Sequence, residues 1–164
     1  MGVDKKNVQV NALIWLWLSF AVVVLDQLSK LIIVHLLVRG DSIVVLPFLN
    51  LTLVYNTGAA FSFLGNLGGA QVYFLTAISL IVIIVMTLWM RSIPRNSYLL
   101  AVGFACIVGG AIGNVIDRIA LSHVIDFIDF HLGSWHFATF NIADSAITIG
   151  AVLLVVHFLF DQAD

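Results

Sequence analysis

Four aspartates are the residues of this chain whose type and position could perform hydrolysis: Asp117, Asp126, Asp129 and Asp144. Two carboxyl groups held close together in a partly dry site cannot both ionise cheaply, so one keeps its proton while the other loses it. The ionised carboxylate can then draw a proton from water, and its partner can protonate the carbonyl of a peptide bond. This pattern indicates aspartic-peptidase chemistry, but spacing alone does not choose among the four residues.

Other catalytic chemistries lack the residues that they need. No serine shares its depth with a lysine or histidine, and Cys106, the single cysteine, lies in an apolar stretch among small residues. A disulfide framework and a zinc site are therefore not expected, and Cys106 is read as a small packing residue. The histidines show no metal-ligand spacing, so we expect no metal ion and no other cofactor. They are His35, His123, His131, His136 and His157.

The composition is that of a membrane protein, since 62% of the 164 residues are hydrophobic and only 10% are charged. Four stretches of roughly 20 residues could each cross a hydrocarbon core of ~30 Å. They are residues 12–36, 71–90, 99–119 and 142–160. We therefore expect a single membrane-embedded domain, residues 1–164, of the all-α integral membrane class with four transmembrane helices.

Two longer segments between these helices are expected to be ordered outside the membrane. Within residues 37–70, apolar and polar residues alternate over 49–55, which is typical of a short strand with one more polar face. Asn56, Gly58 and the small residues after them break the strand. The segment 120–141 is rich in aromatic residues and aspartates. Together they predict a small extracytoplasmic platform containing β-strands, with a loop or short helix over the site.

The positions of lysine and arginine predict the orientation. Lys5 and Lys6 precede the first helix, and Arg91 and Arg95 lie in the short loop between the second and third helices. Because cytoplasmic segments carry the excess of positive charge, both termini are expected in the cytoplasm. The formal net charge of −2, with 7 Lys and Arg residues, provides no basic surface for a phosphate backbone. We therefore expect no nucleic-acid partner.

With this orientation, every ionisable group near the bilayer core falls at one level, the outer face of the membrane, together with Asn114 and Asn141. Their spacing of three or four residues puts neighbours on the same helix face. Ahead of the third-helix group, Ala105, Gly109 and Gly113 form a stripe of small residues that lets another backbone approach. The pattern predicts one polar site between helices, with the third helix central. The polar residues concerned are Asp26, Lys30, Asn114, Asp117, Arg118, Asn141 and Asp144.

Simpler roles remain open for the charged residues of the first and third helices. Asp26 and Lys30 could form an intrahelical ion pair, with Lys30 extending outward to the interface. Arg118 could neutralise Asp117, which would make that aspartate a poor proton acceptor, or it could organise other carboxylates.

Two further alternatives concern the segments that carry the remaining aspartates. Asn141 and Asp144 have the spacing of a capping pair at a helix start, although capping alone does not explain why they share the depth of the other polar residues. If "VIDFIDF" is extended, Asp126 and Asp129 project to opposite sides. One of them then faces the site and the other faces water.

Five motifs make the sequence similar to the lipoprotein signal peptidase (signal peptidase II) family over nearly the whole chain. Each is weak alone, but five in the family's order and approximate separations are highly specific. The resemblance implies an aspartic endopeptidase of the bacterial cytoplasmic membrane, which cuts diacylglyceryl-modified prolipoproteins just before the lipidated cysteine. The motifs are "DQLSK" at 26–30, "YNTGAAFS" at 55–62, "GGAIGNVIDRI" at 109–119, "VIDFIDF" at 124–130 and "FNIADSAITIG" at 140–150.

The resemblance also implies roles for individual residues. Asp126 and Asp144 match the catalytic pair, Asp26 and Lys30 match a mainly structural motif, and Asp129 is not carried over as catalytic. Positions that support the site or contact substrate are matched by Asn56, Gly58, Asn114, Asp117, Arg118 and Asn141.

A substrate anchored by a signal helix and a lipidated cysteine would arrive laterally from the bilayer, so the resemblance places the site near the periplasmic face. We expect residues 41–70 to form a platform and lid, with Asn56 and Gly58 near the substrate. The implied partners are the lipid-modified prolipoprotein and membrane lipids, and the chain is expected to act as a monomer.

Two other classes of function account for part of the pattern. A proton-coupled carrier would also use membrane aspartates, but it should place ionisable groups at several depths, and the inner halves of these helices are bare. An assembly factor, whose polar cluster only joins helices, predicts that Asp126→Asn and Asp144→Asn leave prolipoprotein cleavage intact.

Overall fold

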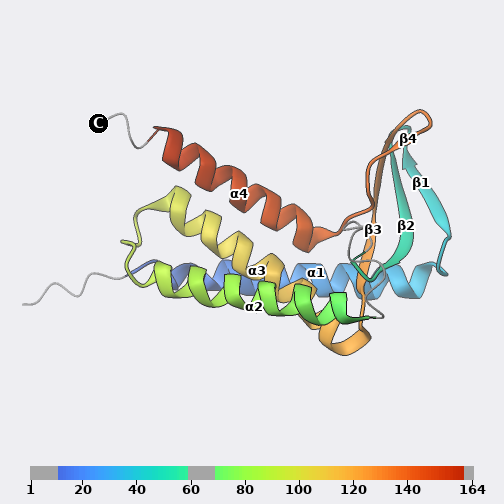
Figure 1. The fold of residues 1–164 in the computed structure, drawn as a ribbon. Coiled ribbons are helices and arrows are strands. Elements are labelled where there is room, and N and C mark those ends of the chain that lie inside the picture. The colour runs from blue at the N-terminus through green and yellow to red at the C-terminus, as the bar shows by residue number, and fades with distance from the viewer. Residues whose placement is uncertain (1–10, 59–68, 161–164) are drawn as a thin grey trace, which may run out of the picture.

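The computed structural model describes residues 11–58 and 69–160, and over these residues it contains four long helices and a small sheet (Figure 1). Each helix is long and apolar enough to cross a membrane. The predicted spans are confirmed, with ends that differ by no more than two residues. The helices are α1 (Leu16–Leu36, preceded by the 3₁₀ turn η1, Ala12–Trp15), α2 (Ala70–Met90), α3 (Tyr98–Leu121) and α4 (Ile142–Phe160).

Helix α3 is the central element of the bundle, as the small-residue stripe predicted. Over the most apolar 18 residues of each helix, 72% are buried in α3, against 22% or less in the other three helices. It packs against α1, α2 and α4. Gly109 allows this close approach, because a Cβ there would lie 2.8 Å from the backbone oxygen of Ser19 in α1. Small residues in this stripe therefore bring the helix backbones together.

The outer helices expose large apolar side chains along their length. Phe20 in α1 is 70% exposed, Ile84 in α2 57% and Phe158 in α4 49%. Contiguous apolar surface of this extent would be a liability in water, whereas it matches the hydrocarbon of a bilayer. The exposed surface thus agrees with a multi-pass membrane protein.

The sheet stands at one end of the helices, and η1 and the end of α4 lie at the other end (Figure 1). Its order is β1-β2-β3-β4, with antiparallel neighbours throughout. The predicted strand over 49–55 is confirmed as β2, whereas β1 and β4 are additional. The strands are β1 (Ser42–Leu46), β2 (Leu49–Asn56), β3 (Val124–Leu132) and β4 (Trp135–His136). The short helix or turn expected after Gly58 falls within 59–68, outside the described residues, as do Lys5 and Lys6.

The alternation predicted for β2 is confirmed, since Leu51, Leu53 and Tyr55 pack in one apolar cluster, but its polar face is not exposed to water. Along this strand only Leu53 is buried, and the other positions are all half-buried. The reason is that β3 supplies partners for the polar side chains: Asn50 and Thr52 both contact the carboxylate of Asp129. Polar residues on β2 therefore bind a neighbouring strand and do not form a separate wet surface.

An apolar cluster attaches the sheet to the bundle and sets the direction of Asp126. Ile33 and Leu37 of α1 pack with Leu53 of β2 and with Ile125 and Phe127 of β3. Successive side chains of a strand point to opposite faces. Since Ile125 and Phe127 face the cluster, the side chain between them is directed to the other face of β3.

Candidate active site

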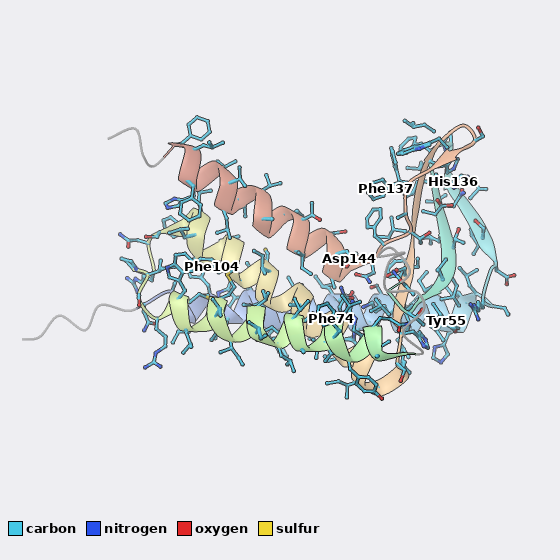
Figure 2. All side chains as sticks on the ribbon, viewed as in Figure 1. Tyr55, Phe74, Phe104, His136, Phe137 and Asp144 are labelled. Carbon is cyan, nitrogen blue, oxygen red and sulfur yellow. The ribbon has the colours of Figure 1, made fainter. Side chains whose placement is uncertain are left out.

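A pocket of about 580 Å³ opens between the sheet, the first turns of α2 and α4 and the last turn of α3. Asp126 and Asp144 both line it, as does Arg118. Figure 2 shows Asp144 at the sheet end of α4 and Phe137 on the segment that leads from β4 to that helix. The remaining lining residues are mostly apolar or small and comprise Asn56, Gly58, Leu75, Phe137, Ala138, Thr139, Phe140, Ser145, Thr148 and Ile149.

Asp126 lies on β3 with only 2% of its surface exposed. Its two carboxylate oxygens accept hydrogen bonds from the side-chain amides of Asn56, at 2.9 Å, and Asn141, at 2.8 Å. Burial raises the pKa of Asp126 to about 6, and the charge of Asp144 adds to this rise, while the two amide hydrogen bonds oppose it. Asp126 is therefore a carboxyl group that holds its proton unusually well.

Asp144 lies in the first turn of α4, where the helix dipole favours negative charge. The side-chain amide of Asn114 donates to one of its oxygens at 2.8 Å, and the backbone N–H of Asn141 lies 3.3 Å from the other. In return, the backbone N–H of Asp144 donates to the side-chain oxygen of Asn141 at 2.9 Å. This reciprocal pair is a capping box. The expected capping pair is present, and it also forms part of the pocket wall.

Asn141 connects the two carboxyl groups. It is fully buried, its side-chain amide donates to Asp126, and its oxygen and backbone N–H bind Asp144. A capping residue needs only the bonds to Asp144, so the bond from Asn141 to Asp126 serves a further purpose. The structure thus brings the dyad, defined here as Asp126 and Asp144, to one pocket through a shared asparagine.

Behind the dyad lies a buried ion triad, formed by Asp26, Lys30 and Asp117. The Lys30 ammonium is 2.8 Å from a carboxylate oxygen of each aspartate, and all three side chains are at most 3% exposed. The expected ion pair between Asp26 and Lys30 is present, but the expectation that Lys30 extends to the interface is wrong. The second carboxylate, on α3, holds the ammonium inside the bundle, where two charges compensate its desolvation.

The interpretation of Arg118 as the partner that neutralises Asp117 is also wrong. Lys30 makes that ion pair, while Arg118 lies half-buried on the pocket wall. Its guanidinium interacts electrostatically most with Asp144 and then with Asp126. Adjacent residues on a helix point about 100° apart, which separates the surroundings of Asp117 from those of Arg118. The alternative reading, in which Arg118 organises other carboxylates, agrees with this placement.

Asp129 faces away from the pocket but does not face water as expected. It is 6% exposed, and its carboxylate binds a ring nitrogen of His136 at 2.8 Å and the amide of Asn50 at 3.2 Å. Burial alone would raise the pKa of Asp129, but these hydrogen bonds and the nearby histidines lower it overall. The alternation of the strand predicted that Asp129 would be hydrated by water, but residues of the neighbouring strands β2 and β4 bind it instead.

Gly58 closes the turn after β2 at the pocket edge. Its φ of +100° is a backbone conformation that side-chain-bearing residues rarely adopt, and a Cβ there would lie 2.8 Å from a methyl carbon of Leu75. The side-chain oxygen of Asn56 accepts the N–H of Gly58 at 2.8 Å while its amide binds Asp126. Gly58 therefore helps to orient the asparagine that contacts the dyad.

Sequence reasoning missed two contributors. Gln27 donates to both aspartates of the ion triad, at 3.1 Å to Asp26 and 2.9 Å to Asp117. Its place inside "DQLSK" was the available signal, but the partner on α3 could be found only in the fold. The segment 137–140 lines the pocket because it runs back along β3, where Phe140 exchanges hydrogen bonds with Ile128.

Comparison with known proteins agrees with this geometry. The family model described as signal peptidase (SPase) II matches residues 18–160. A lipoprotein signal peptidase of Coxiella burnetii is 54% identical over 145 residues, which cover 88% of this chain and 89% of the relative. One of Hydrogenovibrio crunogenus is 49% identical over 146 residues, covering 89% and 85%.

The fold is also similar to a solved structure described as a bacterial membrane enzyme studied by the in meso method at 2.3 Å resolution. The TM-score is 0.79 at 35% identity, with 91% of this chain and 89% of that chain covered. The matched family segment spans all four helices and both carboxyl groups of the pocket. From the sequence match and the shared fold together, this chain belongs to the signal peptidase II family, whose members are membrane aspartic peptidases.

Proposed function

We propose that this chain removes the signal peptide from diacylglyceryl-modified prolipoproteins, by hydrolysis immediately before the lipidated cysteine, with Asp126 and Asp144 as the catalytic pair. The single observation that carries the proposal is the joining of these two carboxyl groups on one pocket by Asn141. Among the described residues, the hydrogen bonds to both carboxyl groups come from amides. No ammonium or guanidinium donates directly to either carboxyl group in these bonds, so the pair can keep one proton between them.

In the proposed reaction the reactive form of the enzyme carries its proton on Asp126, because burial raises the pKa of this group to about 6. This form is a minority of the enzyme above about pH 6. Asp144 takes a proton from water as the water oxygen bonds to the scissile carbonyl carbon, and Asp126 gives its proton to the carbonyl oxygen. The resulting tetrahedral diol then collapses: Asp144 protonates the leaving nitrogen, Asp126 recovers a proton from a diol hydroxyl, and the C–N bond breaks. Both carboxyl groups return to their starting protonation states.

The surrounding residues have supporting roles in this proposal. Asn56, Asn114 and Asn141 hold the carboxyl groups in orientation, and Gly58 holds Asn56. Arg118 lies on the pocket wall, where a guanidinium can bind a substrate carbonyl or organise the dyad. Asp117 supports the site through the ion triad that it forms with Asp26 and Lys30.

The apolar pocket lining suits an acylated substrate that enters from the lipid. Arg91 and Arg95 lie between α2 and α3, at the end opposite the sheet (Figure 1), which supports cytoplasmic termini and a site near the periplasmic face. We further propose that residues 1–164 form one membrane-embedded peptidase domain, which acts as a monomer surrounded by lipid.

The test is cleavage of a synthetic diacylglyceryl-modified prolipoprotein peptide by purified enzyme in detergent. We expect Asp126→Asn and Asp144→Asn each to lower kcat by about 10²- to 10⁴-fold, the usual contribution of acid–base catalysis. Asp129→Asn, on the same strand as Asp126, is the matched control. Cleavage at the wild-type rate by both dyad variants would instead favour a protein whose polar cluster only joins helices.

A further inference from the structure

Lys30 uses every donor of its ammonium group inside the protein. It is 2% exposed, and its Nζ lies 2.8 Å from Asp26 Oδ2, 2.8 Å from Asp117 Oδ2 and 3.2 Å from Asn114 Oδ1. An ammonium has three donors, so the group is satisfied by these three partners. Two are carboxylates that fix it in place, and the third is an amide that contacts the dyad.

The two carboxylates of the ion triad also bind backbone groups next to the dyad. Asp26 Oδ1 accepts the N–H of Ala143 at 2.9 Å, and Ala143 immediately precedes Asp144. Asp117 Oδ2 accepts the N–H of Ile125 at 3.1 Å, and that residue immediately precedes Asp126. Each triad aspartate thus holds the backbone one residue before a dyad aspartate. Lys30 joins the two triad aspartates and so couples α4 to β3.

A second connection runs through the side chain of Asn114. Its oxygen accepts from Lys30 at 3.2 Å, and its NH₂ group donates to Asp144 Oδ1 at 2.8 Å. The reversed amide would turn an NH₂ group toward the ammonium and an oxygen toward the carboxylate, and both contacts would be repulsive. The side-chain amide of Asn141 donates to the same oxygen at 3.2 Å, so Lys30 and Asn141 together determine which end of the Asn114 amide reaches Asp144.

We propose that Lys30 is a positioning residue for peptide hydrolysis: through Asp26 and Asp117 it sets the relative placement of the two dyad segments, and through Asn114 it orients the amide bonded to Asp144. The inference rests on the proposed function of the dyad and extends it to a residue that does not reach the pocket. It differs from a purely structural role, in which the ion triad only holds α1 against α3.

The two roles predict different kinetics. A residue that only stabilises the bundle changes the amount of folded enzyme, whereas a positioning residue changes kcat in the folded enzyme and leaves substrate binding nearly intact. A displacement of about 1 Å in a catalytic group can lower the rate by about 10²-fold. For Lys30→Met in folded enzyme we therefore expect kcat to fall by about 10²-fold and KM to change by no more than about threefold.

A glycine on α3 tests the same idea with every polar group retained. A Cβ on Gly113 would lie 2.6 Å from Asp26 Oδ2, so Gly113→Ala must displace the carboxylate that holds the N–H of Ala143. Gly103→Ala is the matched control on the same helix, because its Cβ would meet Leu154 at 2.9 Å and the backbone oxygen of Gly150 in α4 at 3.1 Å, away from the ion triad. These contacts are about 15 Å along the helix from Gly113.

The experiment measures kcat and KM with the lipid-modified peptide, and thermal unfolding by tryptophan fluorescence, for Lys30→Met, Gly113→Ala, Gly103→Ala and the two dyad variants. We expect Gly113→Ala to lower kcat by about 10-fold or more with KM within about twofold, and Gly103→Ala to change both by no more than about twofold. If Lys30→Met does not fold, the glycine pair decides the question.

The outcomes distinguish a failure of the positioning role from a failure of the proposed function. If the dyad variants lose cleavage but Gly113→Ala retains wild-type kcat, or if both glycine variants lose activity only in proportion to folded protein, the positioning role is wrong and the proposed function stands. If the dyad variants cleave normally, the proposed function itself fails. Selective loss of kcat in Gly113→Ala, together with inactive dyad variants, supports both.

Discussion

The dyad and the ion triad place aspartates in two opposite environments within one end of the bundle. In the triad, Asp26 and Asp117 share an ammonium and also accept bonds from Gln27 and from backbone N–H groups. In the dyad, the two carboxyl groups accept bonds from amides and line an open pocket. The same side chain is ion-paired in the first environment, whereas in the second, under the proposed function, it takes part in proton transfer.

Under the proposed function, the difference explains how a membrane protein can place several carboxylates close together and use only two of them in catalysis. In the triad, a directly bonded ammonium occupies one oxygen of each carboxylate. Amide donors stabilise a carboxylate without supplying a full positive charge, and burial of Asp126 opposes ionisation. Asn114 stands between the two environments, because it accepts from Lys30 and donates to Asp144. The sharpest tests therefore act at this boundary.

The largest effect is expected for Asn114→Asp, which replaces the amide between the triad and the dyad by a carboxylate of almost the same shape. The new carboxylate would be attracted to Lys30 and would place a negative charge where an NH₂ group now lies 2.8 Å from Asp144. Two carboxylates at this distance cannot both ionise cheaply, so the dyad would share its proton with a third group. We expect kcat to fall by about 10²- to 10⁴-fold, measured with the lipid-modified peptide in detergent. Activity within a few-fold of wild type would show that the separation of the two environments is unimportant.

The next effect is on stability, and Asp126→Asn should reveal it. Burial raises the pKa of Asp126 from an ordinary 3.8 to about 6, so between these values the folded protein binds more protons than the unfolded chain. The contribution of Asp126 to the free energy of unfolding therefore falls as pH rises from about 4 to about 6, by about 3 kcal/mol at about 1.4 kcal/mol per pH unit. Asp126→Asn has no titrating group at this position, so its free energy of unfolding does not show this fall.

The measurement for this prediction is the difference in Tm between Asp126→Asn and wild type across pH 4 to 7, since other titrating groups largely cancel in the difference. The variant should gain relative stability up to about pH 6 and then hold a constant advantage. A pH-independent difference would mean that the proton on Asp126 is not controlled by its burial.

Much of this arrangement could be predicted from sequence because the signals are local. Hydrophobic length alone located the four helices, and residue spacing with a depth argument located the outer polar site. The five motifs then identified Asp126 and Asp144. These features depend on residues close together in the chain or on their position relative to the bilayer.

What sequence could not predict depends on partners far along the chain. Lys30 has a long, flexible side chain that suits either the interface or the interior, and its inward direction is decided by Asp117 on another helix. Similarly, "SIVVL" is apolar without alternation, and it becomes β1 only because β2 offers a free edge. The position of Asp129 was misjudged for the same reason, since its partners come from β2 and β4.

A smaller effect is expected for Asn141→Ala, because Asn141 serves both the dyad and the helix cap. Loss of the capping oxygen should lower stability by about 1–2 kcal/mol. The matched control is Asn11→Ala, which removes the side-chain cap of η1 at the opposite end of the bundle. We expect both variants to lower Tm, but only Asn141→Ala to lower kcat, by about 10²-fold. Equal kcat values for the two variants would reduce Asn141 to a capping residue.

The smallest effect is expected for Asp129→Asn, which tests whether two aspartates on β3 respond to pH with opposite signs. Hydrogen bonds from His136 and Asn50 lower the pKa of Asp129 despite its burial, so its contribution to stability is present at neutral pH and is lost as the pH falls below its ordinary value near 4. The His136 side chain is 51% exposed, so we expect the contribution to be below about 1 kcal/mol.

Asp129→Asn should therefore lower Tm slightly at pH 7 and not at pH 3, with kcat within about twofold of wild type. Asp126→Asn should instead gain Tm relative to wild type as the pH rises from 4 to 7, and should lower kcat by about 10²- to 10⁴-fold. The contrast arises because β3 turns one carboxyl group toward the pocket and the other toward a histidine on β4. If the Tm differences of the two variants from wild type changed with pH in the same direction, the two faces of β3 would not give their aspartates opposite pH responses.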